Sequence, residues 1–350
     1  MTRARAAAAL TIVGIAIGCS HPSVRPATVG VVFPEATVGE TRGLVFHVAA
    51  RSSDSSLERQ TRAALSDLLS RESHARIVRL RVFAVGSERL RAVQQLLGQL
   101  LTERHLALPA LSLIGVHALP EPGQLIEMES IAVQSRAVNP LGVAFLAGLA
   151  SPSGARTAGG LAKVARGIGV STTDVVRVSC FYESPDQAAG VKAAITDTFP
   201  SAEMALVQSY GASPSPAVEC EAIARLGEAV AATRYFNLPD APPSPNFSRA
   251  ALVSAPRIAF TGTIAADGNS AADMRGLLDR AAADVGALGA NLGGVAMAGN
   301  YWVTGVARDA LRPVRNAAYG SIVPAATGVF VTSLAPAGAP VALELAVPLS

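Results

Sequence analysis

Three segments of the chain follow one order of expected secondary structure, and this repetition limits the folds that the chain can adopt. The first strand of each segment is expected at residues 43–48, 142–148 and 257–263. An amphipathic helix, a second strand and a second helix follow, and two more strands close each segment. Strands that alternate with helices predict a layered α/β (α+β) fold, in which each unit is a mixed sheet covered by two helices.

Breaks in composition divide the chain between these units. Ala137-Val138-Asn139-Pro140 separates the first two, and the Pro-rich run N-L-P-D-A-P-P-S-P-N-F-S from Asn237 precedes the third. We predict a signal peptide over 1–18, a tether over 19–41, the first unit over 42–136, the second over 137–236, a Pro-rich linker over 237–249 and the third over 250–350.

The N-terminus has the pattern of an export signal. Two arginines in M-T-R-A-R precede an apolar run that is too short for a membrane-spanning helix, which needs about 20 residues. Ala16-Ile17-Gly18-Cys19 resembles the bacterial lipobox, which implies lipidation of Cys19. The residue after Cys19 is Ser20 and not Asp. By resemblance to lipoprotein sorting in double-membraned bacteria, this favours an anchor in the outer membrane, facing the periplasm. The alternative is an ordinary cleaved signal in which Cys19 occurs by chance.

Composition excludes several classes of protein. Half of the 350 residues are hydrophobic and 16% are charged, so the chain can bury a large core and is not disordered. The net charge is +3, and no dense basic run predicts a nucleic-acid partner. The five histidines lack metal-ligand spacing, and no phosphate-binding loop occurs, so we expect no metal and no cofactor.

An acidic strand recurs near the end of each unit. Residues 216–225 read P-A-V-E-C-E-A-I-A-R, residues 124–133 read Q-L-I-E-M-E-S-I-A-V, and residues 341–348 read V-A-L-E-L-A-V-P. Glu127 and Glu219 are the first acids of two of these strands. They could be cleft carboxylates, or strand residues that alternate onto a solvent-facing side. Glu344 fits the second acidic position better than the first.

Several motifs in the three units resemble the RidA (YjgF-type) family. They include D-V-V-R-V-S-C-F-Y at 174–182, V-E-C-E-A-I-A at 218–224, I-V-R-L-R-V-F at 77–83 and I-A-F-T-G-T-I at 258–264. The family forms homotrimers with clefts between subunits. The resemblance therefore implies that the three units of one chain form an intramolecular pseudo-trimer. The whole chain is then expected to be a monomer.

The resemblance also implies a reaction, the hydrolysis of 2-imino and 2-enamino acids. In the family an Arg of a P-A-R-S/T motif clamps the substrate carboxylate, and the first Glu of the E-x-E pair helps to place or activate water. Glu127 and Glu219 match that Glu, so the resemblance makes them the candidate catalytic residues. Here Leu111 and Ala326 stand at two of the Arg positions, and the second unit reads F-P-S-A-E-M. The family's reaction in its usual form is therefore not expected.

Three hypotheses remain. The first is a protein that binds a small metabolite, such as a carboxylate, or a partner in its inter-unit clefts. The second is a divergent enzyme of RidA or chorismatase type, acting on 2-imino acids or a chorismate-like acid, and the third is an envelope scaffold. Arginines converging on one cleft would favour an enzyme or an anion binder, whereas apolar clefts would favour the scaffold.

Other residues carry less specific signals. Cys180 and Cys220 lie in apolar strand-like runs and are expected to be buried free thiols, although export would allow a disulfide. Arg79 and Arg177 are expected to face solvent. Asn300-Tyr301-Trp302 contains the one Trp of the chain and could line a pocket or fill the core.

Overall fold

The computed structural model describes residues 31–52, 54, 56–71, 75–210, 217–240 and 243–349. The predicted signal peptide and Cys19 lie outside the described residues. Within these ranges, the helices are all too short or too polar to cross a membrane.

The first unit is a sheet whose core order is β4-β3-β5-β2, with β3 parallel to β4 and the other pairs antiparallel. Its elements are β2 (Leu44–Val48), α1 (Leu57–Arg71), β3 (Arg76–Val85), α2 (Arg89–Glu103), β4 (Ala110–Val116) and β5 (Ile126–Val133).

The second and third units repeat this topology, with core orders β8-β7-β9-β6 and β15-β14-β17-β12. The second unit contains β6 (Val143–Ser151), α3 (Gly154–Gly167), β7 (Val175–Tyr182), α4 (Gln187–Thr198), β8 (Glu203–Gln208) and β9 (Val218–Arg225). The third contains β12 (Arg257–Thr261), β13 (Ile264–Ala265), α5 (Ala271–Gly286), β14 (Met297–Trp302), α6 (Gly305–Tyr319), β15 (Ala325–Phe330) and β17 (Val341–Leu349). The predicted fold class of three mixed sheets, each with two helices, is confirmed.

Short additional strands extend the sheets across the expected boundaries. β1 (Ala36–Glu40), within the predicted tether, pairs with β12 of the third unit. β11 (Ala250–Val253), at the predicted start of the third unit, joins β6 of the second, and β10 (Arg234–Phe236) pairs with β11. β16 (Ser333–Leu334) pairs with β4 of the first unit. These strands cover edge N–H and C=O groups that would otherwise need water.

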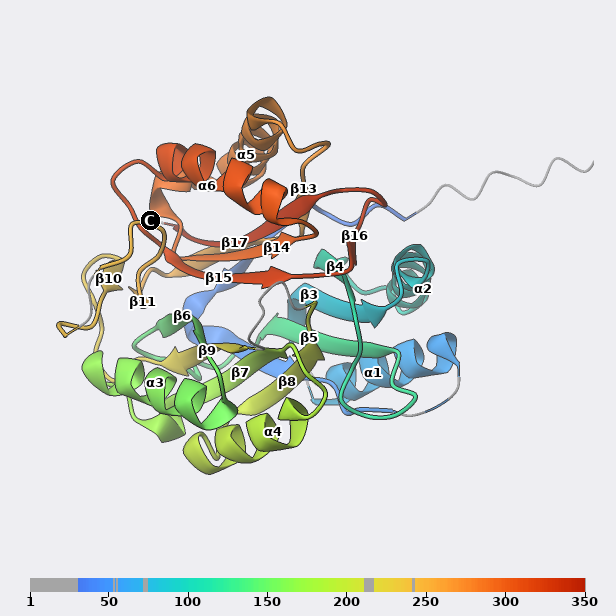
Figure 1. Cartoon of the computed structure of the whole chain (residues 1–350), viewed down its shortest axis with the longest axis horizontal. Helices are drawn as coiled ribbons and strands as arrows, with labels where there is room; N and C mark the ends of the chain where they lie inside the picture. Colours follow the sequence, from blue (N-terminus) through green and yellow to red (C-terminus); the bar gives the residue numbers. More distant parts are fainter. Residues whose placement is uncertain are drawn as a thin grey trace, which may run out of the picture. The chain divides into compact units, whose positions relative to one another are not determined.

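Two kinds of core hold the units together. Within each unit, the apolar stripes of two helices pack on one sheet face, around Leu65, Leu161 or Leu277. Figure 1 shows these helix pairs on the outer sides of the sheets. The opposite sheet faces meet one another through side chains from all three units, among them Phe46, Phe145 and Phe260. The sheet face that is free of helices is therefore an interface between units and not a solvent surface.

The two cysteines of the second unit form a disulfide, so the expectation of free thiols is wrong. Cys180 in β7 and Cys220 in β9 are directly opposite each other, with Cα atoms 4.1 Å apart, and both are fully buried. Opposite positions on antiparallel strands bring two Cβ atoms within bonding reach, a pairing that sequence separation does not reveal.

Candidate functional site

The second acidic residue of each repeated strand lies in one buried ionic cluster where the three units meet. Its carboxylates are Glu129, Glu221 and Glu344, and its cations are Arg79, Arg81 and Arg177. Arg81 contacts one carboxylate from each unit, at 2.5 Å from Glu129, 2.9 Å from Glu221 and 3.1 Å from Glu344. The acidic strand is therefore repeated because each unit contributes one carboxylate to a shared centre.

Hydrogen bonds complete this central cluster. Ser112 donates to Glu344 over 2.6 Å, and Tyr301 donates to the same carboxylate over 2.9 Å. Burial opposes ionisation of Glu344, but Arg79, Arg81 and these donors lower its pKa to about 2. Charged side chains that are paired in this way join the three units, and Arg81 and Arg177 also lower the pKa of Glu129 against the effect of its burial.

Arg79 and Arg177 belong to this cluster, so the expectation that they face solvent is wrong. Arg79 is 7% exposed and forms an ion pair with Glu344, and Arg177 is 5% exposed and lies 3.6 Å from Glu129. Period-two alternation places them on the sheet face away from the helices, and that face is covered by the neighbouring units.

The first acidic residue of the strand has a different environment. Glu219 points into the cleft between the second and third units, where its Oε1 accepts a hydrogen bond from the Gly328 amide over 3.2 Å. Burial, together with the nearby Glu221 and Glu183, raises the pKa of Glu219 to about 7 against the effect of that hydrogen bond. Glu219 is therefore a carboxyl group that can hold or release a proton near neutral pH.

Gly148 of β6 makes room for this carboxylate. A Cβ atom at position 148 would lie 2.1 Å from Glu219 Oε1, and β6 shifts its register against β9 between Leu146 and Leu149. The irregular strand and the missing side chain let the acid turn into the cleft.

Glu127, the equivalent residue of the first unit, is buried, whereas Glu219 is half-buried. It is 2% exposed, accepts a hydrogen bond from Gln124 over 2.5 Å and lies 3.6 Å from Arg51. Burial raises its pKa to about 7, although Arg51 lowers it. Within the described residues, its Oε1 has no hydrogen-bond partner. Neither Glu127 nor Glu219 therefore lies on an open solvent face.

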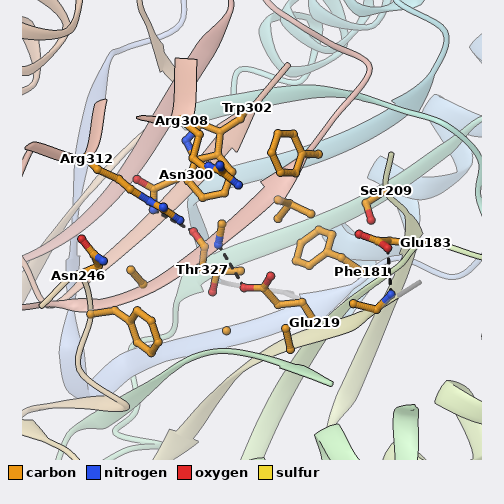
Figure 2. Close-up of a pocket in the computed structure, with 18 of the residues that line it drawn as sticks. Phe181, Glu183, Ser209, Glu219, Asn246, Asn300, Trp302, Arg308, Arg312 and Thr327 are labelled. Carbon is orange, nitrogen blue, oxygen red and sulfur yellow. Dashed lines mark hydrogen bonds between the residues drawn. The ribbon is translucent and has the colours of Figure 1, made fainter. Parts of the chain in front are cut away.

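The cleft at Glu219 contains a cavity of about 450 Å³. Figure 2 shows Arg308, Arg312, Asn300 and Trp302 gathered on one wall, with Glu219 beside Thr327 and with Glu183 near Ser209. The arginines come from α6, where residues 308, 312 and 315 have i, i+4, i+7 spacing and share one helix face. Arg249, the last residue of the predicted Pro-rich linker, also lines the cavity.

Arg315 lies deepest among these cations. It is 4% exposed and donates to Asn300 Oδ1 over 3.1 Å and to the Asn246 carbonyl over 3.0 Å. Burial lowers its pKa, and no carboxylate forms an ion pair with it in the described part of the chain. Its Nε atom has no hydrogen-bond partner there. A buried guanidinium without a counter-ion favours an anion in the adjoining cavity.

The remaining arginines lie closer to solvent. Arg308 and Arg312 are half-buried and share Asp309, at 2.8 Å and 3.9 Å. The Arg249 guanidinium lies 5.0 Å from the ring centre of Phe247, a cation–π contact.

The cleft between the first and third units has a different set of charged residues, because Glu35, Asp267, Arg280 and Asp284 line its cavity. Ala342 occupies the position of Glu219, because Ala342 pairs with Tyr301 as Glu219 pairs with Phe181. Leu111 is 8% exposed, and its carbonyl accepts a hydrogen bond from the Thr263 amide over 3.3 Å. The three clefts have therefore diverged, as separate copies in one chain can.

Sequence reasoning found part of this cavity. It identified Glu219 as a cleft candidate and Ala326 as the position of a missing arginine, and both line the cavity. Asn300 and Trp302, which were weighed between pocket and core, line it too. The cations on α6 were missed, although R-D-A-L-R-P-V-R at 308–315 carries the helical spacing that could have revealed them. Arg249 has no such signal.

Comparisons with known proteins match parts of the chain that are about as long as one unit. Residues 51–134 match the family model described as Endoribonuclease L-PSP. A YjgF/YER057c/UK114-family protein from Mycobacterium tuberculosis is 26% identical over 29% of this chain and 86% of its own, with a TM-score of 0.25. The Rid-family protein YyfB from Yersinia pestis is 21% identical over 33% of this chain and 98% of its own, with a TM-score of 0.31. No curated protein matches the chain.

Proposed function

Since this chain belongs to the RidA/YjgF family, through the unit at residues 51–134, we propose that it is an exported, lipid-anchored protein that binds a small carboxylate metabolite. The binding site is the cavity between the second and third units. The convergence of Arg249, Arg308, Arg312 and Arg315 on this one cavity carries the proposal.

The polar atoms of the cavity support an anionic ligand. Arg315 is a buried cation without a paired carboxylate in the described chain, and an anion beside it would offset the cost of its burial. The buried Thr327 Oγ1 and Trp302 Nε1 also have no hydrogen-bond partner among the described residues, and both side chains line the cavity. Buried polar groups are normally paired, so a ligand or water is expected to satisfy them.

The position of these cations agrees with the lost family motif. Ala326 in β15 stands where the resemblance expects the carboxylate-binding arginine, and it lines the same cavity. Arg315 comes from α6, the helix directly before β15. We infer that α6 supplies the guanidinium that the strand has lost.

The test of this proposal is carboxylate binding by the full chain in detergent. Acetate, butyrate and benzoate should raise the melting temperature, because ligands that bind only the folded state stabilise it. Arg315→Gln should abolish the shift. Arg275 is exposed on α5, so the control variant Arg275→Gln should show the same shift as the parent protein. The proposal is wrong if no carboxylate shifts the melting temperature of the parent protein.

The proposed export rests on the sequence before residue 31, and the Cys180–Cys220 disulfide supports it because oxidising compartments preserve such bonds. Cys19→Ala should move the protein from the membrane fraction to the soluble fraction. Retention in the membrane fraction would contradict lipidation at Cys19.

A second candidate function is catalysis in the same cavity, and the environment of Glu219 favours it. A carboxyl group with a pKa of about 7 is suited to general acid–base chemistry. We would follow the loss of 2-imino acid generated in situ by an amino-acid oxidase. Turnover that is lost in Glu219→Gln and kept in Glu127→Gln would identify an enzyme. If the parent protein hydrolyses the 2-imino acid no faster than the spontaneous reaction, the catalytic candidate is wrong and the binding function stands.

A further inference from the structure

The arginines of the cavity form two groups at different depths. Arg315 is nearly fully buried and is fixed by Asn300 and by the Asn246 carbonyl. Arg308 and Arg312 lie nearer the opening, with 33% and 42% of their side chains exposed. A single carboxylate bound at Arg315 would leave Arg308 and Arg312 in contact with solvent and not with the ligand.

The charge of the cavity exceeds what one carboxylate neutralises. Four arginines line the cavity, whereas its lining has two carboxyl groups, Glu183 and Glu219, and Asp309, which pairs with Arg308 and Arg312, is 62% exposed and lies outside the lining. Asp309 is shared by Arg308 and Arg312, and Glu183 accepts a hydrogen bond from the Ala217 amide over 2.9 Å.

The walls between the charged groups are apolar. The rings of Phe181, Phe247, Trp302 and Phe330 line the cavity, and Trp302 and Phe330 pack with ring centres 5.7 Å apart. Gly328 leaves space for the indole ring, because a Cβ atom there would lie 1.9 Å from it. These surfaces suit the hydrocarbon part of a ligand and offer it no hydrogen bonds.

We propose that the ligand is a small dicarboxylate, with one carboxylate at Arg315 and the other at Arg308 and Arg312. The apolar frame between the two carboxylates lies against the aromatic walls. This inference rests on the proposed function, since it specifies the ligand of the same cavity. The second carboxylate distinguishes it from general carboxylate binding.

The test compares matched acids by titration calorimetry on the full chain in detergent at pH 6 and low salt. The probe pairs are benzoate with isophthalate and butyrate with glutarate. Each diacid should bind at least about tenfold more tightly than its monoacid, which corresponds to about 1.4 kcal/mol. Raising the salt concentration should weaken the diacids more, because screening acts on both charges.

Two arginine variants separate the inner and outer groups. Arg312→Gln should bring diacid affinity to the monoacid level and should weaken monoacid binding by a smaller factor than diacid binding. Arg315→Gln should weaken both classes. Circular dichroism and the melting temperature of each variant would show that a lost affinity does not reflect unfolding.

The outcomes separate this inference from the proposed function. Monoacids and diacids that bind within threefold of each other would overturn the dicarboxylate inference and leave carboxylate binding intact. If none of the four acids binds the parent protein, both proposals are wrong. Diacid preference that survives Arg312→Gln would also overturn the assignment of the second carboxylate to the outer arginines.

Proton binding by Glu219 gives an independent check. Raising the pH from 6 to 8 ionises this carboxyl group, which faces Glu183, Glu221 and the Gly328 amide, and adds one negative charge to the cavity. Diacid affinity should therefore fall over this range, and Glu219→Gln should remove most of the fall. An unchanged diacid affinity between pH 6 and 8 would contradict the charge balance.

Discussion

The centre of the molecule and its cleft use two carboxylates of the same strand in opposite ways. Glu221 and Glu219 lie two residues apart on one face of β9. Glu221 meets Arg81 at 2.9 Å in the central cluster, whereas Glu219 meets a backbone amide beside a cavity. The first strand of this kind, β5, repeats the contrast with Glu129 and Glu127.

The difference shows that burial alone does not determine the charge of an acid. Burial opposes ionisation at both places, but guanidinium neighbours lower the pKa of Glu129 in the centre. Without such close partners, the pKa of Glu219 rises to about 7. The centre is therefore a permanent ionic contact between units, and the cleft holds an acid that exchanges its proton near neutral pH.

The largest effect is expected from breaking the centre. Arg81→Met removes the cation that contacts all three units and leaves buried carboxylates with fewer partners. Loss of one partner of a buried ion pair costs about 3–5 kcal/mol, so the free energy of unfolding should fall by this amount. Denaturant titration measures it.

Arg91→Met is the control for this variant, because Arg91 is exposed on α2. It should change the free energy of unfolding by less than about 0.5 kcal/mol. A loss below 1 kcal/mol for Arg81→Met would show that the cluster does not hold the units together.

The pH dependence of stability should have opposite signs for the two kinds of acid. The folded protein keeps the proton of Glu127 up to about pH 7, whereas the unfolded chain releases it near the ordinary value of 4.5. Glu127 therefore lowers stability as the pH rises from 4.5 to 7, by about 3 kcal/mol for a shift of this size. Glu127→Gln should remove this loss when unfolding is measured across the range.

Glu344 should act in the opposite direction. Its folded pKa of about 2 lies below the ordinary 4.5, so its contribution is present above pH 4.5 and is lost as the pH falls towards 2. Glu344→Gln should reduce the dependence of the unfolding free energy on pH below pH 4.5. Above pH 5 the free energies of the variant and the parent protein should change with pH in the same way. Equal slopes for both variants would contradict the contrast between centre and cleft.

A smaller effect is expected from two glycine substitutions. Gly148→Ala places a methyl group against the Glu219 carboxylate and should cost about 1–3 kcal/mol, because the surroundings must shift. Gly159→Ala, in α3, meets no atom within 4 Å and should stabilise the protein by about 0.5–1 kcal/mol. Thermal unfolding compares the two, and carboxylate affinity should fall only in Gly148→Ala.

Much of the fold followed from local patterns. Alternation located the strands at 77–85 and 175–182, and helical periodicity located α2, whose first residue, Arg89, was expected. The short additional strands that cross the expected boundaries between units were not predicted. β1 and β11 are short, and whether each pairs with β12 or β6 depends on which sheet edge is near.

The candidate site was predictable only in part. The E-x-E pattern identified Glu127 and Glu219, yet the same pattern could not show that Glu129 and Glu221 serve the centre. Arg79 and Arg177 were placed in solvent because strand alternation identifies a face without showing what covers it.

Local patterns in the chain predicted three units of one topology and the residues that share each sheet face, since helix and strand periods are local properties. The pairing of β7 with β9 brings Cys180 to Cys220, and the packing of the units joins Arg81 to three carboxylates and places Arg315 and Glu219 in one cavity. These contacts join residues 40 to more than 200 positions apart, or residues of different units. Such contacts, and the charges that they stabilise, depend on how the units pack, which no local pattern specifies.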